Sequence, residues 1–157
     1  MAQEIERKFL VNSDAWRAQA GRAEQYRQGY LSDSQECSIR VRISNEHAYL
    51  NIKSATLGVQ RTEYEYPLPL QDAEEMLALF CRRPIIMKTR YFVEYESHVW
   101  EIDVFEGDNE GLVVAEIELD DEHERFARPP WLGREVSDDP RYYNVCLVEH
   151  PYTQWRD

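Results

Sequence analysis

Cysteines, paired histidines and long apolar runs are all scarce in this sequence. There are only three cysteines, Cys37, Cys81 and Cys146, and their odd number and wide spacing fit neither a disulfide framework nor a cysteine metal site. The four histidines lack the paired spacing of a zinc site. No apolar run is long enough to span a bilayer, and the first residues do not resemble an export signal. We therefore expect a cytoplasmic protein with reduced thiols that is not embedded in a membrane.

Positive charge is also scarce. The 157 residues include 18 Lys and Arg against 30 Asp and Glu, a formal net charge of -12. Such a chain repels nucleic acid and anionic membrane surfaces, so we expect neither as a partner. An anionic small molecule could be held only by a local group of basic side chains, by a metal ion, or by both. The length, with no repeat or linker, predicts a single domain over residues 1–157.

Strict alternation of polar and apolar residues recurs along the chain and predicts strands with one polar and one apolar face. We expect these strands over residues 2–11, 24–31, 37–45, 47–54, 59–68, 86–96, 98–106 and 112–119. Short turn-forming clusters separate them, which favours antiparallel neighbours. A helix is expected over 72–82, with a capping box formed by Asp72 and Glu75 and an apolar stripe that ends at Phe80. Shorter helices are expected from residue 13 or 14 to 21 and over 140–148.

Charged residues occupy the polar positions of almost every predicted strand, and acids and bases lie on separate strands. A solvated sheet face would explain any one strand, but such a face normally mixes in Thr, Ser, Gln and Asn. If the strands close into a barrel with the charges inside, each set repels itself, and a hard divalent cation together with a polyanion would neutralise both. The acids are Glu4 with Glu6, Glu63 with Glu65, Glu101 with Asp103, and Glu116 with Glu118; the bases are Arg40 with Arg42, Lys53, and Lys88 with Arg90.

The run Glu4-Ile5-Glu6-Arg7-Lys8 resembles the ExExK opening of the CYTH, or triphosphate tunnel metalloenzyme, superfamily. Six further segments are similar to the successive strand motifs of that family, in the same order. They are Ser38-Ile39-Arg40-Val41-Arg42, Leu50-Asn51-Ile52-Lys53, Arg61-Thr62-Glu63-Tyr64-Glu65, Lys88-Thr89-Arg90, Glu101-Ile102-Asp103 and Glu116-Ile117-Glu118. The resemblance implies an α+β, mainly β fold: an eight-stranded antiparallel closed barrel, or tunnel, with a polar lumen and a few flanking helices.

The resemblance also implies a site. It implies one or two Mg²⁺ or Mn²⁺ ions and a small-molecule triphosphate as substrate, and the compact length is most like short bacterial members that act on inorganic tripolyphosphate. We expect the catalytic centre to contain Glu4, Glu6, Lys8, Lys53 and Lys88. The expected phosphate-binding residues are Lys8, Arg40, Arg42, Lys53, Lys88 and Arg90. The expected metal ligands are Glu4, Glu6, Glu63, Asp103, Glu116 and Glu118, with Glu65, Glu101 and Arg61 left in secondary roles.

The expected reaction is hydrolysis of the terminal phosphoanhydride by an in-line water. Alternatives within the same fold are an adenylate cyclase and a thiamine or nucleoside triphosphatase. A non-catalytic polyphosphate-binding module is a further alternative, although simple anion binding needs no paired carboxylates. A lipocalin-like carrier would want an apolar lumen.

A homodimer is compatible with the sequence. The late aromatic segment could either plug one tunnel mouth or simply bury apolar side chains.

Overall fold

The computed structural model describes residues 3–34, 36–55 and 58–155. Residue 2, at which the first strand was expected to begin, lies outside them. The strands are β1 (Gln3–Val11), β2 (Ala20–Asp33), β3 (Cys37–Ser44), β4 (His47–Ser54), β5 (Gln60–Leu68), β6 (Ile86–Tyr95), β7 (His98–Phe105), β8 (Val113–Leu119) and β9 (Leu132–Glu135). The helices are α1 (Leu70–Leu79) and α2 (Asn144–Glu149), with short 3-10 helices η1 (Ala15–Gln19), η2 (Gly107–Asn109), η3 (Pro140–Tyr142) and η4 (Tyr152–Gln154).

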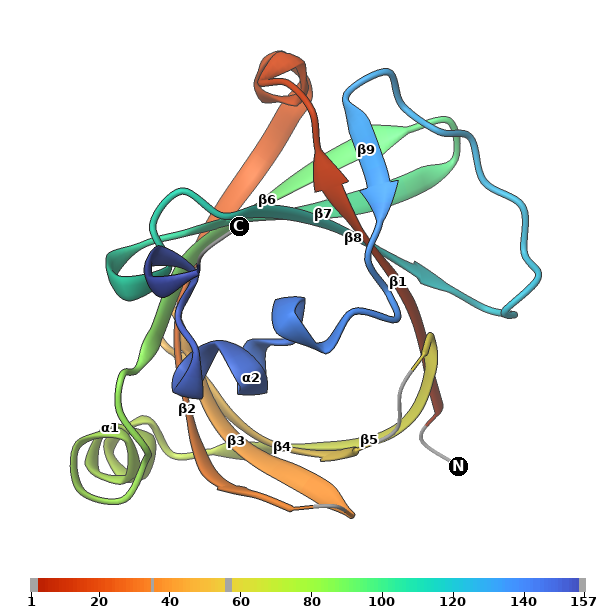
Figure 1. Ribbon diagram of the computed structural model, residues 1–157. Helices are drawn as coiled ribbons and strands as arrows, with labels where there is room; N and C mark the ends of the chain where they lie inside the picture. Colours follow the sequence, from red (N-terminus) through yellow and green to blue (C-terminus); the bar gives the residue numbers. More distant parts are fainter. Residues whose placement is uncertain (1–2, 35, 56–57, 156–157) are drawn as a thin grey trace.

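Strands β1 to β8 close into a ring (Figure 1). Neighbouring strands pair in the order β5-β4-β3-β2-β6-β7-β8-β1, and the pairing of β5 with β1 completes the circle. Every pairing in the ring is antiparallel. Closure leaves none of these strands with a long unpaired edge. The expected fold class, a mainly β, eight-stranded antiparallel closed barrel, is confirmed.

Strand β9 was not predicted from the sequence. It pairs with the end of β1, joining Phe9 to Glu135 and Val11 to Leu132. The segment is short and shows no alternation, so its strand character depends on the neighbour it meets. Gly133 permits the close approach, because a Cβ at this position would lie 2.9 Å from the carbonyl oxygen of Leu10.

Apolar side chains on the outside of the barrel are covered in two places. Around β1, β6, β7 and β8, the cover includes Trp16 of η1 and Trp131, which are 0% and 2% exposed. Over β3 and β4, the cover is α1, through Ala73 and Leu77. These contacts explain why the sequence carries an amphipathic stretch and isolated tryptophans between its strands.

Several predicted helix details are wrong. Helix α1 begins at Leu70 after Pro69 and has no side-chain cap, so the expected capping box of Asp72 and Glu75 does not form. Phe80 comes after the last helical residue and is 69% exposed instead of lying on the apolar stripe. The first expected helix is only the 3-10 turn η1, because β2 already starts at Ala20 rather than at residue 24. The expected 140–148 helix is divided into η3 and α2.

The interior of the barrel is divided into two halves. At one end the inward side chains of β2, β6, β7 and β8 are apolar, and they pack against Leu147 and Val148 of α2, which are 0% and 4% exposed. In Figure 1, α2 lies within the ring of strands. The polar lumen therefore occupies only part of the barrel, and the C-terminal segment closes the other end while burying its own apolar residues. The inward apolar residues are Tyr30, Ile86, Phe105, Leu112 and Val114.

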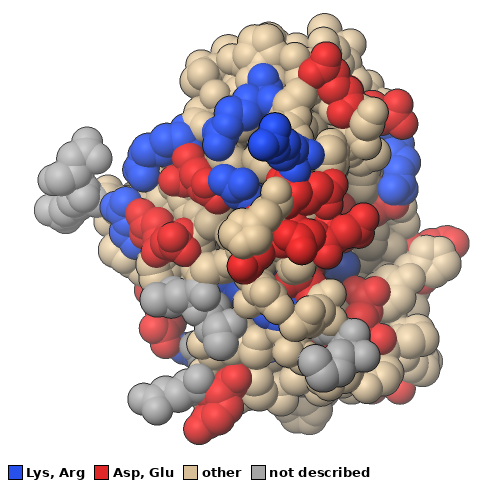
Figure 2. Space-filling model, turned by 90° about the vertical axis from the view of Figure 1, so that its right-hand side faces the viewer, with Lys and Arg blue, Asp and Glu red and all other residues tan. Residues whose placement is uncertain are grey.

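Charges on the outside are mixed in sign. On the face drawn in Figure 2, Lys and Arg side chains lie directly beside Asp and Glu side chains in one broad band. Exterior pairs include Arg7 with Glu135 at 2.6 Å and Arg27 with Glu74 at 2.7 Å. Within the described part of the chain, no helix has the length and apolar character needed to cross a bilayer.

Candidate active site

The polar half of the barrel contains a cavity of about 380 Å³. Its wall consists of side chains at alternate positions of the strands, because successive residues of a strand point to opposite faces. Every predicted site residue except Asp103 lines it: the bases Lys8, Arg40, Arg42, Lys53, Lys88 and Arg90, and the acids Glu4, Glu6, Glu63, Glu116 and Glu118. Residues from six widely separated strands thus meet in one enclosed space.

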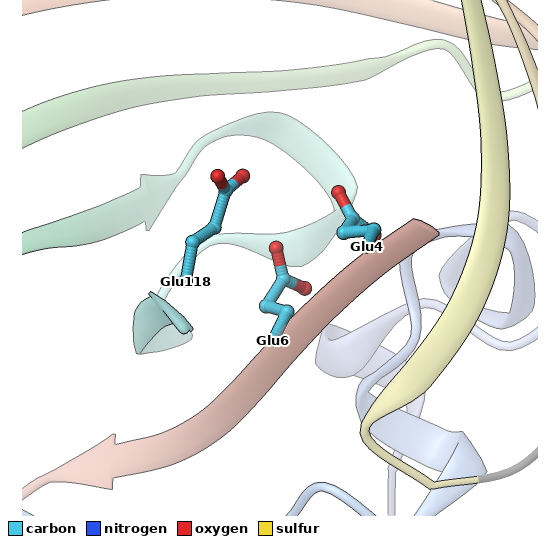
Figure 3. A group of neighbouring side chains, drawn as sticks. All are labelled: Glu4, Glu6 and Glu118. Carbon is cyan, nitrogen blue, oxygen red and sulfur yellow. The ribbon is translucent and has the colours of Figure 1, made fainter. Parts of the chain in front are cut away.

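Three carboxylates form a group at the junction of β1 and β8 (Figure 3). Each of Glu4, Glu6 and Glu118 offers an oxygen, and these atoms lie within 4.8 Å of one another. The register explains the grouping, because Glu6 and Glu118 are direct cross-strand partners. Burial raises the pKa of Glu118, and repulsion from Glu4 and Glu116 raises it further. The three carboxylates therefore crowd one another, and a cation bound among them would relieve the repulsion.

Glu4 connects this group to a lysine. Its carboxylate forms an ion pair with Lys53 Nζ at 3.0 Å, and Lys53 Nζ also lies 3.7 Å from the carboxylate of Glu63. Burial raises the pKa of Glu4, and attraction to Lys53 only partly opposes this effect. Burial would lower the pKa of Lys53, but Glu6 and Glu4 outweigh burial and raise it. Lys53 thus stays a cation beside the acidic group.

Two arginines of the cavity wall lie against the ring of Tyr26. The guanidinium carbons of Arg42 and Arg90 lie 4.7 Å and 5.0 Å from its centroid. Burial lowers the pKa of Arg42, and repulsion from Arg40 and Arg90 lowers it further. Like the acids, the bases are closer together than their charges favour, and an anion between them would relieve this repulsion.

Asp103 does not line the cavity. It is 0% exposed and lies between its two cross-strand partners, Arg90 on β6 and Val114 on β8, at the boundary between the charged and the apolar half. One oxygen accepts from Lys88 Nζ at 2.7 Å and the other from Arg90 Nε at 2.8 Å. Burial would raise its pKa, but Arg90 and Lys88 outweigh burial and lower it. Asp103 therefore holds Lys88 and Arg90 in place, and its expected role as a metal ligand stays a prediction.

Two further acids contact bases of the wall. Glu65 lies 3.4 Å from Arg42, and Glu101 lies 3.3 Å from Arg90. Burial raises the pKa of Glu101 to about 7. Attraction to Arg90 opposes this rise only in part, and repulsion from Glu116 and Asp103 adds to it. Both residues line the cavity, and the secondary role expected for them stays a prediction.

Sequence reasoning missed the uncharged part of the site. The cavity wall also includes Asn51, Ser137, Tyr143 and Asn144. Asn51 donates to Glu65 at 2.8 Å and accepts from Arg40 at 3.3 Å, so its place on alternating strand β4 could have identified it. The other three come from the segment after β9, where a helix was expected over 140–148 but no residue was assigned to the site.

Comparison with known proteins agrees with this geometry. The model of the CYTH domain family matches residues 2–143. This chain belongs to the CYTH domain family. The family predicted from the ExExK run and the later strand motifs is therefore confirmed, and the triphosphatases of this CYTH family are generally metal-dependent.

Curated CYTH relatives match over nearly their full length. An inorganic triphosphatase from Acetivibrio thermocellus is 46% identical over 157 residues, which is 100% of both chains. An inorganic triphosphatase from Nitrosomonas europaea is 34% identical over 149 residues, 92% of this chain and 96% of the relative. The crystal structure of the inorganic triphosphatase NE1496 matches with a TM-score of 0.67 at 32% identity, covering 94% of this chain and 95% of that one.

Proposed function

We propose that this CYTH protein is a metal-dependent inorganic triphosphatase that releases the terminal phosphate of inorganic tripolyphosphate. The observation that carries the proposal is the joint enclosure of a group of cations and a group of carboxylates in one cavity of about 380 Å³. Some acids and bases pair with one another, as Lys53 does with Glu4, but like charges still crowd each group, and a divalent cation with a linear polyanion would relieve both. The inorganic triphosphatases that match over nearly their full length support the same activity.

The acidic group suits a hard divalent cation. Glu4, Glu6 and Glu118 supply only oxygen ligands, whose atoms lie within 4.8 Å of one another. Magnesium and manganese prefer such ligands, and magnesium usually keeps some of its waters. We propose one or two such ions, with Glu63 and Glu116 as neighbouring carboxylates. When bound, the metal supplies positive charge to the phosphate oxygens and helps to activate water.

The basic residues bind and orient the substrate. The planar guanidinium groups of Arg40, Arg42 and Arg90 can each bind two phosphate oxygens at once. The ammonium groups of Lys8, Lys53 and Lys88 act as point charges. A water attacks the terminal phosphorus in line with the bridging oxygen, the phosphoanhydride bond breaks, and pyrophosphate leaves with the bond electrons. The surrounding cations stabilise the charge on the transferring and leaving groups.

The test is a substrate panel. Purified protein is incubated with tripolyphosphate, pyrophosphate, ATP or thiamine triphosphate, with Mg²⁺, Mn²⁺ or a chelator, and released phosphate and cyclic nucleotide are measured. We expect phosphate release to be fastest from tripolyphosphate and to stop with the chelator. Cyclic AMP as the main product of ATP would establish a cyclase instead, and tight tripolyphosphate binding without turnover would establish a non-catalytic module.

We also propose that the enzyme is cytoplasmic and has no nucleic-acid partner. Cys37 and Cys81 carry free thiols, which suits a reducing cytoplasm. An acidic chain of net charge -12 has no general attraction for nucleic acid. A homodimer remains a prediction, and light scattering on the eluate of a sizing column measures it.

A further inference from the structure

Asn144 brings an uncharged side chain to the closed end of the cavity. It is the first residue of α2 and part of the cavity wall. Its Oδ1 accepts two hydrogen bonds, from Lys88 Nζ at 2.9 Å and from Gln28 Nε2 at 2.8 Å. Both donors belong to the barrel and are nearly inaccessible, at 2% and 0% exposure. The amide therefore sits where the polar half of the lumen meets the apolar half.

The two donors fix the orientation of the Asn144 amide. An ammonium group can only donate, and so can the amide nitrogen of Gln28. Turning the Asn144 amide over would place its NH₂ group against both of them, so the oxygen must face Lys88 and Gln28. The Nδ2 group points the other way, and among the described residues it has no hydrogen-bond partner. Asn144 thus presents a free N–H donor on the cavity wall.

We propose that Asn144 Nδ2 is a phosphate-binding donor that contacts an oxygen of the phosphate group seated next to Lys88. This inference rests on the proposed triphosphatase function. The neighbouring cations already repel one another, as at Arg40 and Arg42, and a neutral donor binds a phosphate oxygen without adding to that repulsion. Asn144 belongs to the segment that closes the barrel. A phosphate bound to Asn144 therefore also stabilises the position of that segment.

The decisive variant is Asn144→Asp. A carboxylate has nearly the same shape and keeps an acceptor for Lys88 and Gln28, but it replaces the N–H donor with a negative oxygen. We expect the KM for tripolyphosphate to rise roughly a hundredfold, with a smaller change in kcat and no loss of thermal stability. The dissociation constant of tripolyphosphate, measured by calorimetry with a chelator present, should rise in parallel.

Asn144→Ala provides a second measurement that does not depend on the folding of the first variant. It removes the donor without adding charge, so we expect KM and the dissociation constant to rise roughly tenfold, less than with Asp. Asn109→Asp is the matched control. Asn109 is 2% exposed and its Oδ1 accepts from the backbone of Tyr152, so it also secures the C-terminal segment, but outside the cavity wall. We expect its KM to equal that of the wild type.

A double variant separates direct contact from an effect through Lys88. If Asn144 serves only to hold Lys88, Lys88→Gln and Lys88→Gln/Asn144→Ala should bind tripolyphosphate equally well, which would overturn the inference. A folded Ala variant with an unchanged dissociation constant would overturn it as well. A wild-type protein that neither binds nor hydrolyses tripolyphosphate would instead refute the proposed function itself.

Discussion

The two halves of the barrel interior are built by the same strands but are filled in opposite ways. On β6 the inward side chains change from apolar to charged between Ile86 and the next inward residue, Lys88. On β7 the same change occurs between Phe105 and Asp103. The apolar half is filled by α2 of the same chain, whereas the charged half encloses a cavity. Alternation therefore decides which side chains point inward, and their chemistry decides what must fill the space.

The difference has an energetic consequence. The apolar half gains stability from burial, at roughly 25 cal/mol per Å². The charged half gains little by itself, since burial and like-charge neighbours raise the pKa of Glu4 and Glu118 and lower that of Arg42. One half thus stabilises the fold so that the other can hold crowded like charges, a division typical of active sites.

The largest effect should come from the acidic group. We expect Glu6→Gln and Glu118→Gln each to lower kcat for tripolyphosphate about 10³-fold, equal to roughly 4 kcal/mol of lost transition-state stabilisation. The unfolding temperature in the absence of metal should stay the same or rise, because one of several crowded charges is gone. Phosphate release and thermal melting measure the two quantities.

Glu110→Gln is the control for this prediction. Glu110 is an exposed acid in the loop after η2 and lies outside the cavity wall. Its turnover should match that of the wild type. Near-normal turnover of both cavity variants would show that the acidic group does not serve the reaction.

Sequence reasoning succeeded where the alternation is regular and failed where it is absent. Lys88 and Glu116 could be predicted because each lies at an inward position of a long strand. Asp103 also lies at an inward position, and the pattern could not reveal that it is opposite Val114 and outside the cavity wall. Strand β9 and the place of Asn144 in the cavity wall could not be predicted, because both depend on how the C-terminal segment packs on the barrel.

Asp103, at the boundary between the halves, should give the next largest effect. Asp103→Asn leaves the buried cations Lys88 and Arg90 without their full counter-charge, so we expect the free energy of unfolding to fall by roughly 3 kcal/mol. Urea denaturation measures it, with Asp72→Asn in the exposed first turn of α1 as the control. A variant that is as stable as the wild type but inactive would instead support the predicted role of Asp103 as a metal ligand.

A smaller effect is expected deep in the apolar half. Ile86 is 0% exposed and packs in the same cluster as Leu147 of α2. Ile86→Val removes one buried methylene, which should cost about 1 kcal/mol of unfolding free energy and leave kcat within a factor of two. Val99→Ala, at a position that is 48% exposed, should change neither. A large loss of activity from Ile86→Val would mean that the two halves are not independent.

The smallest effect is expected outside the barrel, where charges are paired one to one. Arg7 and Glu135 lie 2.6 Å apart, and the hydrogen bond from Arg7 lowers the pKa of Glu135. A lowered pKa stabilises the fold above the pKa of the unfolded chain, and this contribution disappears as the pH falls through the folded pKa. Glu135→Gln should therefore cost up to about 1 kcal/mol at neutral pH and almost nothing in strong acid. Urea denaturation of both proteins across this range measures the difference. A difference that stays constant with pH would mean that packing of the side chain, and not its charge, accounts for the cost.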